Sequence, residues 1–463
     1  MRAVSTILLL LIFRCAAAEG EKYIYRIWLA DKGRNCYSTE RPEEFLSAKA
    51  LERRVKQGIA ITEEDLPPSE HYITEILKYG GKAICRSRWL NTVLVASNSA
   101  RLAAKLGKLP FVKEAELIYE KRKETTGLPP ALQYGSMDSL PQPDSVYGYS
   151  RQAEILNGTP LHTQGYRGKG ITIAVLDAGF ADIGDMPEQI DASRIKGYYD
   201  AVMDGGDMNG GQAHGTAVLS VMLADKRGEL SGCAPEADYM LIRTEYFGNE
   251  YRQEEDFWVR GAEYADSIGA DIITSSLGYT RFDATSRQYR ASDRDGNTAV
   301  ISRGAAAAAR KGIAVIVGAG NNGHDGGSPL PFPSDADGIT AVGSCNRDGR
   351  ISAFSSGGYT CDGRVRPDIV APGEEIAVTI DGGRLATASG TSYSTPAAAG
   401  LTACLMQAFP QCGAMEIMQL IKESSSRYDA PEPPYGYGMP NFGVALLKAA
   451  ERYGTPAAAV TEQ

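Results

Sequence analysis

The sequence predicts an α/β protein in which a large parallel sheet with helices on both faces follows a small α+β domain. From residue 171 onward, continuously apolar segments alternate with helical stretches, as in parallel sheets covered on both faces. Before about residue 120, shorter alternating segments flank helices in a different order. A proline-rich stretch separates the two regions, so we expect two folded units joined by a linker.

Composition excludes several classes of function. The chain has 463 residues, 43% of them hydrophobic, which is ample for a large core. With 48 Lys+Arg against 57 Asp+Glu, its net charge is −9, which argues against a nucleic acid as the main partner. There are four histidines and neither an HExxH nor a CxxC motif, which argues against a zinc site.

Residues 1–18 have the organisation of a signal peptide. Arg2 precedes an apolar stretch at 7–13, and small residues follow at 16–18. The segment therefore predicts a secreted or periplasmic protein. Lipid attachment at Cys15 is the alternative, but the charged Arg14 just before it argues against a lipoprotein. Because no later stretch is long and apolar enough, we expect no membrane span.

Residues 19–120 form the predicted α+β domain. Phe45, Ala48, Leu51 and Val55 follow a helical period, and a second helix starts near Ser69. With the first helix set aside, the order is β-α-β-β-α-β, the ferredoxin-like arrangement. The expected elements are strands at 22–30, 82–88, 92–97 and 115–119, and helices over 43–57, 69–79 and 102–106.

Residues 121–146 form the linker, 147–450 the large domain and 451–463 a C-terminal tail. The linker opens with Lys121-Arg122-Lys123, which indicates either a cleavage site or a solvated charge run. In the large domain we expect strands at 171–176, 239–243, 271–276, 313–317 and 338–342, and helices near 214–223, 256–268 and 299–311.

Four polar residues fall at the ends of predicted elements in the large domain. Asp177 ends a strand, His214 opens a helix after a glycine-rich loop, and Ser392 precedes a helix of small residues. Asn321 follows another strand through a Gly-Ala-Gly turn. Parallel sheets bind ligands at the carboxyl ends of their strands, so these side chains are expected to converge.

These residue types suit nucleophilic acyl transfer. A serine hydroxyl needs an adjacent base, and histidine has a pKa near neutrality. The carboxylate of Asp177 would fix the imidazole of His214, while the Asn321 side chain and the Ser392 N–H would stabilise an oxyanion. Taken singly, each residue has a structural alternative, such as a strand-end cap, a helix start or a turn. The four together favour catalysis.

The motifs around these residues resemble those of subtilisin-like serine proteases, the subtilases (peptidase S8 type), in the family's order Asp, His, Ser. The matching segments are Val175-Leu176-Asp177-Ala178-Gly179, His214-Gly215-Thr216, Ala319-Gly320-Asn321 and Gly390-Thr391-Ser392 with Pro396. The resemblance implies a subtilisin-like sheet and a serine endopeptidase acting on protein or peptide substrates through an acyl-enzyme. It also implies that Ser276, Leu277, Gly278 and Gly320 bind the substrate backbone. Residues 19–120 resemble a subtilase propeptide, which in the family assists folding and inhibits the enzyme.

The sequence departs from the family pattern in places. Ala178 stands where a Thr or Ser is usual, Tyr393 and Ser394 where Met and Ala are common, and Ser220 where Gly is frequent. The alternative function is therefore a catalytically weak or inactive binding protein on the same fold. No cofactor is required for the expected chemistry. Calcium is common in the resembled family, and the aspartate-rich loops at 204–207 and 335–337 are either ligands or solvated turns.

The cysteines leave two interpretations open. Cys15 would leave with the signal peptide, which leaves an odd number in the mature chain. Cys36 with Cys85, and Cys345 with Cys361, are plausible disulfide pairs. Free buried thiols are the other interpretation.

Overall fold

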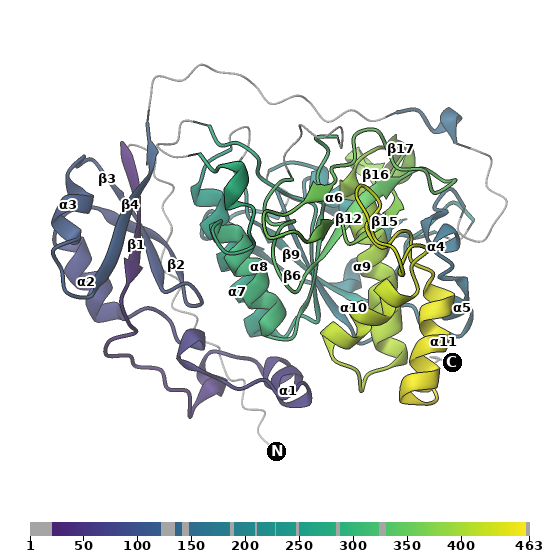
Figure 1. Cartoon of the computed structure of the whole chain (residues 1–463), viewed down its shortest axis with the longest axis horizontal. Helices are drawn as coiled ribbons and strands as arrows, with labels where there is room; N and C mark the ends of the chain where they lie inside the picture. The colour runs from purple at the N-terminus through teal and green to yellow at the C-terminus, as the bar shows by residue number, and fades with distance from the viewer. Residues whose placement is uncertain are drawn as a thin grey trace.

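The computed structural model describes residues 21–121, 135–140, 148–185, 189–208, 211–226, 228–246, 250–283, 288–323 and 330–459. The predicted signal peptide and most of the predicted linker lie outside these residues. Within them, a small N-terminal lobe packs beside a larger lobe (Figure 1).

The small lobe is built on an antiparallel sheet of four strands in the order β2-β3-β1-β4. With the first helix set aside, one helix connects the first strand to the second and another connects the third to the fourth. This order confirms the predicted ferredoxin-like arrangement. The strands are β1 (Tyr23–Leu29), β2 (Lys82–Ser87), β3 (Thr92–Ser97) and β4 (Val112–Glu120), and the helices are α1 (Ala48–Lys56), α2 (Glu70–Leu77) and α3 (Leu102–Leu106).

Both faces of this small sheet are buried, and the large lobe covers one of them. Side chains alternate between faces along a strand, so Val93 and Val95 pack toward α2 and α3, whereas Leu94 and Ala96 pack toward the large lobe. There they share an apolar cluster with Phe257. The small lobe therefore completes its core against the large one.

The large lobe contains a seven-stranded parallel sheet in the order β15-β12-β11-β10-β5-β9-β6. Its strands are β5 (Thr172–Asp177), β6 (Ile195–Asp200), β9 (Asp238–Arg243), β10 (Ile272–Ser275), β11 (Ala314–Gly318), β12 (Thr340–Cys345) and β15 (Ile369–Pro372). Short two-stranded ribbons lie outside it: β7 (Asp225–Lys226) with β8 (Leu230–Ser231), β13 (Gly358–Tyr359) with β14 (Val365–Arg366), and β16 (Ile376–Ile380) with β17 (Arg384–Ala388).

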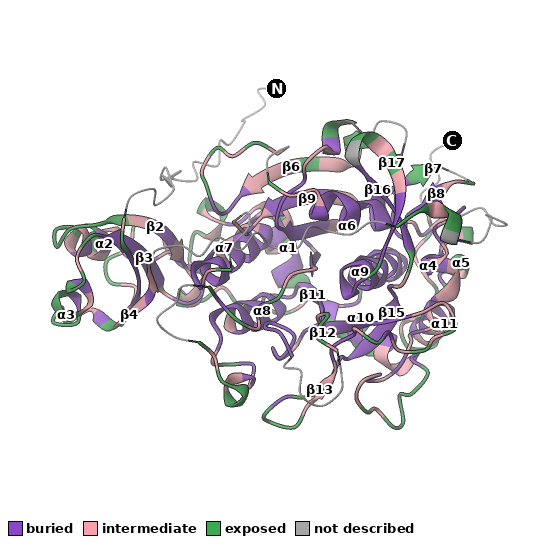
Figure 2. Ribbon diagram, turned by 90° about the horizontal axis from the view of Figure 1, so that it is seen from above, coloured by how far each residue is buried: buried purple, intermediate pink, exposed green. Residues whose placement is uncertain are grey.

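Helices cover both faces of the parallel sheet, as the sequence predicts (Figure 2). Ile173 and Val175 of β5 pack in the cluster that contains α6 and α9, whereas Ala174 and Leu176 pack in the one that contains α7 and α8. The helices are α4 (Gln152–Ile155), α5 (Thr159–Thr163), α6 (His214–Leu223), α7 (Gln253–Ile268), α8 (Val300–Arg310), α9 (Thr391–Ala408), α10 (Ala414–Glu423) and α11 (Phe442–Tyr453).

Two strands of the parallel sheet, β6 and β15, were not predicted. They are its two edge strands. The sequence of β6, Ile-Lys-Gly-Tyr-Tyr-Asp, is mostly half-buried and lacks a continuous apolar run. β15 has only four residues and ends in a proline. Proline has no N–H to donate, which an edge strand tolerates because no further strand pairs with its outer side.

The apolar face predicted for the helix at 43–57 is not the face that is buried. The helix exists as α1, but Val55 is 81% exposed, whereas Ala50, Arg53 and Arg54 are buried. Both arginines pair with the carboxylate of Asp266 in the large lobe, whose position the local pattern does not reveal.

Neither suggested disulfide forms, because all seven cysteines of the described residues are free thiols. Cys85 and Cys345 are buried while their suggested partners, Cys36 and Cys361, are exposed. The buried-thiol interpretation holds for Cys85, Cys345 and three further cysteines: Cys233, Cys404 and Cys412. Among the described residues, no helix has the length and hydropathy needed to cross a membrane.

Candidate active site

The site lies where four adjacent strands of the parallel sheet end. In sheet order these are β11, β10, β5 and β9, and their carboxyl ends lead to Asn321, Ser276, Asp177 and Glu245. Two helices begin at the same edge: α6 with His214, and α9 with Thr391 and Ser392. The topology therefore brings together residues that are up to 215 positions apart, as expected for this class of sheet.

Asp177 and His214 form a hydrogen-bonded pair. The Asp177 Oδ1 lies 2.8 Å from the His214 Nδ1 and also accepts the Ala178 N–H at 2.8 Å. The start of α6 is held close because the Gly215 N–H donates to the Gly179 carbonyl at 3.0 Å. A Cβ on Gly215 would lie 2.4 Å from that carbonyl oxygen, so only glycine permits this approach.

The environment raises the pKa of His214. Burial alone would lower it, but the charge and hydrogen bond of Asp177, together with the charge of Glu245, outweigh burial and raise the pKa above its usual value of 6.5. The imidazolium is therefore stabilised relative to an isolated histidine, as a base requires when it accepts a proton during the reaction.

Ser392 occupies the first turn of α9, where backbone N–H groups have no partner within the helix. It is buried, with 8% of its surface exposed. Its carbonyl accepts the Ser276 hydroxyl at 2.9 Å, and the ring of the next residue, Tyr393, has its centroid 6.2 Å from that of His214. These contacts place the serine turn between the predicted substrate strand and the imidazole.

Asn321 is oriented by the same turn. Its Oδ1 accepts both the N–H of Thr391, at 2.9 Å, and the Thr391 hydroxyl, at 3.1 Å. Because a backbone N–H can only donate, this contact assigns the amide oxygen and leaves Nδ2 as the free donor end. A Cβ on Gly390 would lie 3.4 Å from Nδ2, so the donor faces the backbone just before Ser392.

Of the four residues expected to bind the substrate backbone, Ser276 contacts this turn through its hydroxyl. Ser276 and Leu277 are half-buried and Gly278 is exposed, directly after β10. Gly320 has φ +99°, and a Cβ there would lie 2.4 Å from Pro331 Cγ. A larger residue at position 320 would therefore narrow the same edge of the site.

The sequence analysis missed Glu245. It lies two residues beyond β9, half-buried, and its Oε1 accepts the Tyr279 hydroxyl at 2.8 Å. Burial, with a further contribution from the charge of Asp177, raises its pKa to about 7, although Tyr279 and His214 act in the opposite direction. The available signal was an acid directly after a predicted strand, the same signal that identified Asp177.

One oxygen of the Asp177 carboxylate has no partner among the described residues. Asp177 is fully buried, yet its Oδ2 accepts no hydrogen bond from any described residue. The sequence departure at Ala178 explains this orphan oxygen, since a hydroxyl-bearing residue there could bond locally whereas alanine cannot.

The other polar candidates have structural partners. His162 is held by the Cys233 carbonyl at 3.0 Å, and burial lowers its pKa to about 4; His71 lies on α2, and His324 falls outside the described residues. Asp204 pairs with Arg260, and Asp335 accepts the Ser302 hydroxyl. Within the described residues, no group of three or more His, Cys, Asp or Glu side chains could hold a metal ion.

Comparison with known proteins decides the family. The profile of the subtilase family of S8 peptidases matches residues 168–438. This range contains Asp177, His214, Asn321 and Ser392. The chain belongs to the subtilase family. A second profile, the S8 propeptide domain of Bacteroidota, matches residues 24–129. This subtilase is thus a serine endopeptidase preceded by a propeptide.

Individual relatives agree with this assignment. An intracellular serine protease of Paenibacillus polymyxa is 30% identical over 275 residues, which cover 58% of this chain and 76% of the relative. Subtilisin E of Bacillus subtilis is 28% identical over 306 residues, covering 65% and 70%.

Solved structures agree in fold. The crystal structure of fervidolysin from Fervidobacterium pennivorans has a TM-score of 0.62 at 20% identity, covering 93% of this chain and 62% of that one. The structure of MycP1 from the ESX-1 type VII secretion system has a TM-score of 0.54 at 20% identity, covering 70% and 90%. At this level of identity the likeness concerns the fold alone.

Proposed function

We propose that this subtilase is a secreted endopeptidase that hydrolyses peptide bonds through Asp177, His214 and Ser392. The observation that carries the proposal is the 2.8 Å contact between Asp177 and His214 at the sheet edge where the first turn of α9 presents Ser392. The predicted signal peptide supports export. All the groups that this reaction needs are present, which favours an enzyme over a binding protein on the same fold.

In the proposed reaction, the Ser392 hydroxyl attacks the carbonyl carbon of the scissile bond as the His214 imidazole takes its proton. The C–N bond then breaks, and His214 returns the proton to the departing amine. Water repeats the sequence on the acyl-enzyme, which releases the acid and restores the serine. Asp177 holds the imidazole tautomer throughout and stabilises its cationic form.

Two donors would stabilise the oxyanion of each tetrahedral intermediate. The Ser392 N–H lies at the positive end of α9, and the Asn321 Nδ2 is directed by the two hydrogen bonds from Thr391. The segment Ser276-Leu277-Gly278 after β10, together with Gly320, would align the substrate backbone. No cofactor takes part in these steps, and a structural calcium ion remains a separate hypothesis.

The decisive test is covalent labelling. A fluorophosphonate probe should modify Ser392 in folded, processed enzyme, and peptide mapping should find the adduct on that residue. Ser392→Ala should fold, remain unlabelled and lose nearly all peptidase activity. Unlabelled Ser392 in folded protein freed of its propeptide would favour the binding-protein alternative, and comparable activity in Ser392→Ala would refute this site.

We further propose that residues 19–120 inhibit the enzyme until it cuts its own chain between Lys121 and Ser150. Most of this segment lies outside the described residues. Mass spectrometry of wild type and Ser392→Ala should find a mature N-terminus in this segment only for wild type. Identical cleavage in both would mean that another protease processes the chain. Purified 19–120 that does not slow the enzyme would contradict the inhibitor role.

A further inference from the structure

Two parts of the small lobe contact the large lobe. One is the face of its sheet that packs on α7 around Phe257. The other is residues 42–66, the clamp segment, which contains α1 and the short 3-10 turns Pro42–Glu44 and Glu63–Asp65. In Figure 1 the clamp segment extends away from the small sheet to lie below α7.

The clamp segment caps the C-terminal ends of two helices in the large lobe. Arg53 donates to the Ala270 carbonyl just beyond α7, at 2.5 Å, and to the Lys311 carbonyl just beyond α8, at 3.3 Å. Gln57 donates to the Gly312 carbonyl at 2.8 Å and accepts the N–H of Ala414. The chain has left the helix at these carbonyls, and the clamp side chains of Arg53 and Gln57 donate to them.

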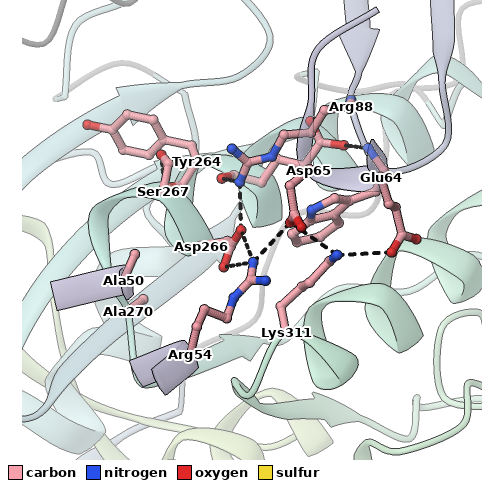
Figure 3. A network of polar contacts seen from close by, with 12 residues as sticks. Ala50, Arg54, Glu64, Asp65, Arg88, Tyr264, Asp266, Ser267, Ala270 and Lys311 are labelled. Carbon is pink, nitrogen blue, oxygen red and sulfur yellow. Dashed lines mark hydrogen bonds and ion pairs between the residues drawn. The ribbon is translucent and has the colours of Figure 1, made fainter. Parts of the chain in front are cut away.

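A network of buried charges joins the same surfaces. The Asp266 carboxylate at the end of α7 pairs with Arg53. Figure 3 shows its other two pairs, with Arg54 at 2.9 Å and with Arg88, the residue after β2, at 2.7 Å. Lys311 crosses in the other direction and lies 3.0 Å from Asp65. Asp266 and Arg54 are essentially inaccessible to water, so each depends on its partners across the interface.

The charges around Asp65 are matched well enough to overcome its burial. Burial would raise the pKa of this carboxyl, but the N–H of Thr62 and the cations of Arg54 and Lys311 lower it below its usual value. Asp65 therefore stays ionised and holds one cation from each lobe. The clamp segment and the large lobe are thus complementary in charge as well as in shape.

The fit is close at the backbone. Gly269 and Gly312 follow α7 and α8 with φ +85° and +83°. A Cβ on Gly269 would lie 2.7 Å from Lys49 Cβ, and one on Gly312 would lie 2.7 Å from Gln57 Nε2. Side chains at these two helix ends would push the clamp segment away.

This surface lies at the edge of the parallel sheet opposite the candidate active site. Lys49 bonds to Thr172, the first residue of β5, and pairs with Asp271 just before β10. Asp177, the last residue of β5, belongs to the catalytic site. Six residues of extended strand separate the two edges by roughly 20 Å, so the clamp segment binds without reaching the catalytic residues.

We propose that the clamp segment is a second enzyme-binding part of the propeptide, and that it holds the propeptide on the enzyme after the linker has been cut. The inference rests on the proposed zymogen function. Cutting the linker breaks the covalent connection between the propeptide and the enzyme. It leaves intact the contacts of the clamp segment beyond α7 and α8 and the ion pairs of Asp266. Cleavage and loss of the propeptide are therefore separate events, and the lifetime of the cut complex is set at the edge remote from catalysis.

The test uses the full-length Ser392→Ala chain with the recognition sequence of an unrelated protease placed within 122–134. After that protease has cut the linker, gel filtration at physiological salt should give a single complex of both fragments. The large lobe is then immobilised on a sensor surface through its C-terminus, and the dissociation rate of the N-terminal fragment is measured. Because the added protease makes the cut, this experiment does not depend on whether the enzyme is active.

The double variant Arg53→Ala/Arg54→Ala should dissociate about 100-fold faster or more, because Asp266 is left buried beside Arg88 alone. Gln57→Ala, which removes two hydrogen bonds without removing a charge, should dissociate about tenfold faster and guards against misfolding of the arginine variant. The matched control is Arg41→Ala, which breaks an exposed pair with Glu44 at the start of the clamp segment and should change the rate less than about threefold.

Two results would overturn the proposal. One is that the cut chain with an unaltered interface separates into its two fragments on gel filtration. The other is dissociation of the Arg53→Ala/Arg54→Ala and Gln57→Ala variants at the rate of the Arg41→Ala control. If the unmodified enzyme shows neither peptidase activity nor self-cleavage, the proposed function is refuted. The dissociation rates of the cut Ser392→Ala complexes do not depend on that result.

Discussion

Replacing Glu245 by glutamine should stabilise the protein at alkaline pH and have little effect at acid pH. Burial raises the pKa of Glu245 from 4.5 to about 7, so the folded state binds a proton that the unfolded state has lost. Stability therefore falls as the pH rises from about 4.5 to 7, and the full penalty above pH 7 is about 3 kcal/mol. Glutamine resembles the protonated form and can still accept the Tyr279 hydroxyl.

The expected gain in the free energy of unfolding is about 3 kcal/mol at pH 8 and less than about 1 kcal/mol at pH 5. Denaturant unfolding of Ser392→Ala and of Ser392→Ala/Glu245→Gln at both pH values measures it without self-digestion. Glu432→Gln, at an exposed residue paired with Arg427, is the control and should change neither value by more than about 0.5 kcal/mol. An equal gain at both pH values would refute the ionisation argument.

The same substitution should move the activity profile. The negative charge of Glu245 helps to raise the pKa of His214, so in the active enzyme Glu245→Gln should shift the acid limb of kcat/KM to lower pH. A merely structural role for Glu245 would change the height of the profile and leave its midpoint in place. An unchanged midpoint would contradict the electrostatic link between the two side chains.

Three further substitutions test the site. Asp177→Asn should lower kcat about 10⁴-fold with an unchanged melting temperature, because His214 loses the acceptor that fixes its tautomer; peptide hydrolysis and thermal unfolding measure the two effects. Ala178→Ser should supply a donor for the orphaned Asp177 Oδ2 and raise the free energy of unfolding by about 1 kcal/mol in denaturant titrations. Gly215→Ala should lower it by about 1–3 kcal/mol and reduce kcat, since its Cβ would lie 2.4 Å from the Gly179 carbonyl oxygen.

The edge of the sheet that carries the candidate site could be predicted from sequence because local signals determine its parts. The predicted helix at 214–223 coincides with α6, and Asp177 ends its strand as expected. A parallel topology then brings such ends to one edge without further information. Glu245 escaped because its role depends on Tyr279 and Asp177, which reach it only through the order of strands in the sheet.

The clamp segment shows where a periodic pattern predicts the element but not its environment. The spacing of apolar residues predicted a helix at α1, yet that pattern placed Val55 on the inner face and the arginines outside. The structure has the reverse, because the carboxylate of Asp266, more than 200 residues later in the chain, pairs with both Arg53 and Arg54. A helix that buries guanidinium groups and exposes valine has little to gain from packing on its own lobe. Its position is instead determined by Asp266 and by the backbone carbonyls that follow α7 and α8 in the large lobe. We therefore expect substitutions in this helix to lower the affinity of the propeptide for the enzyme, although they lie far from the candidate catalytic residues.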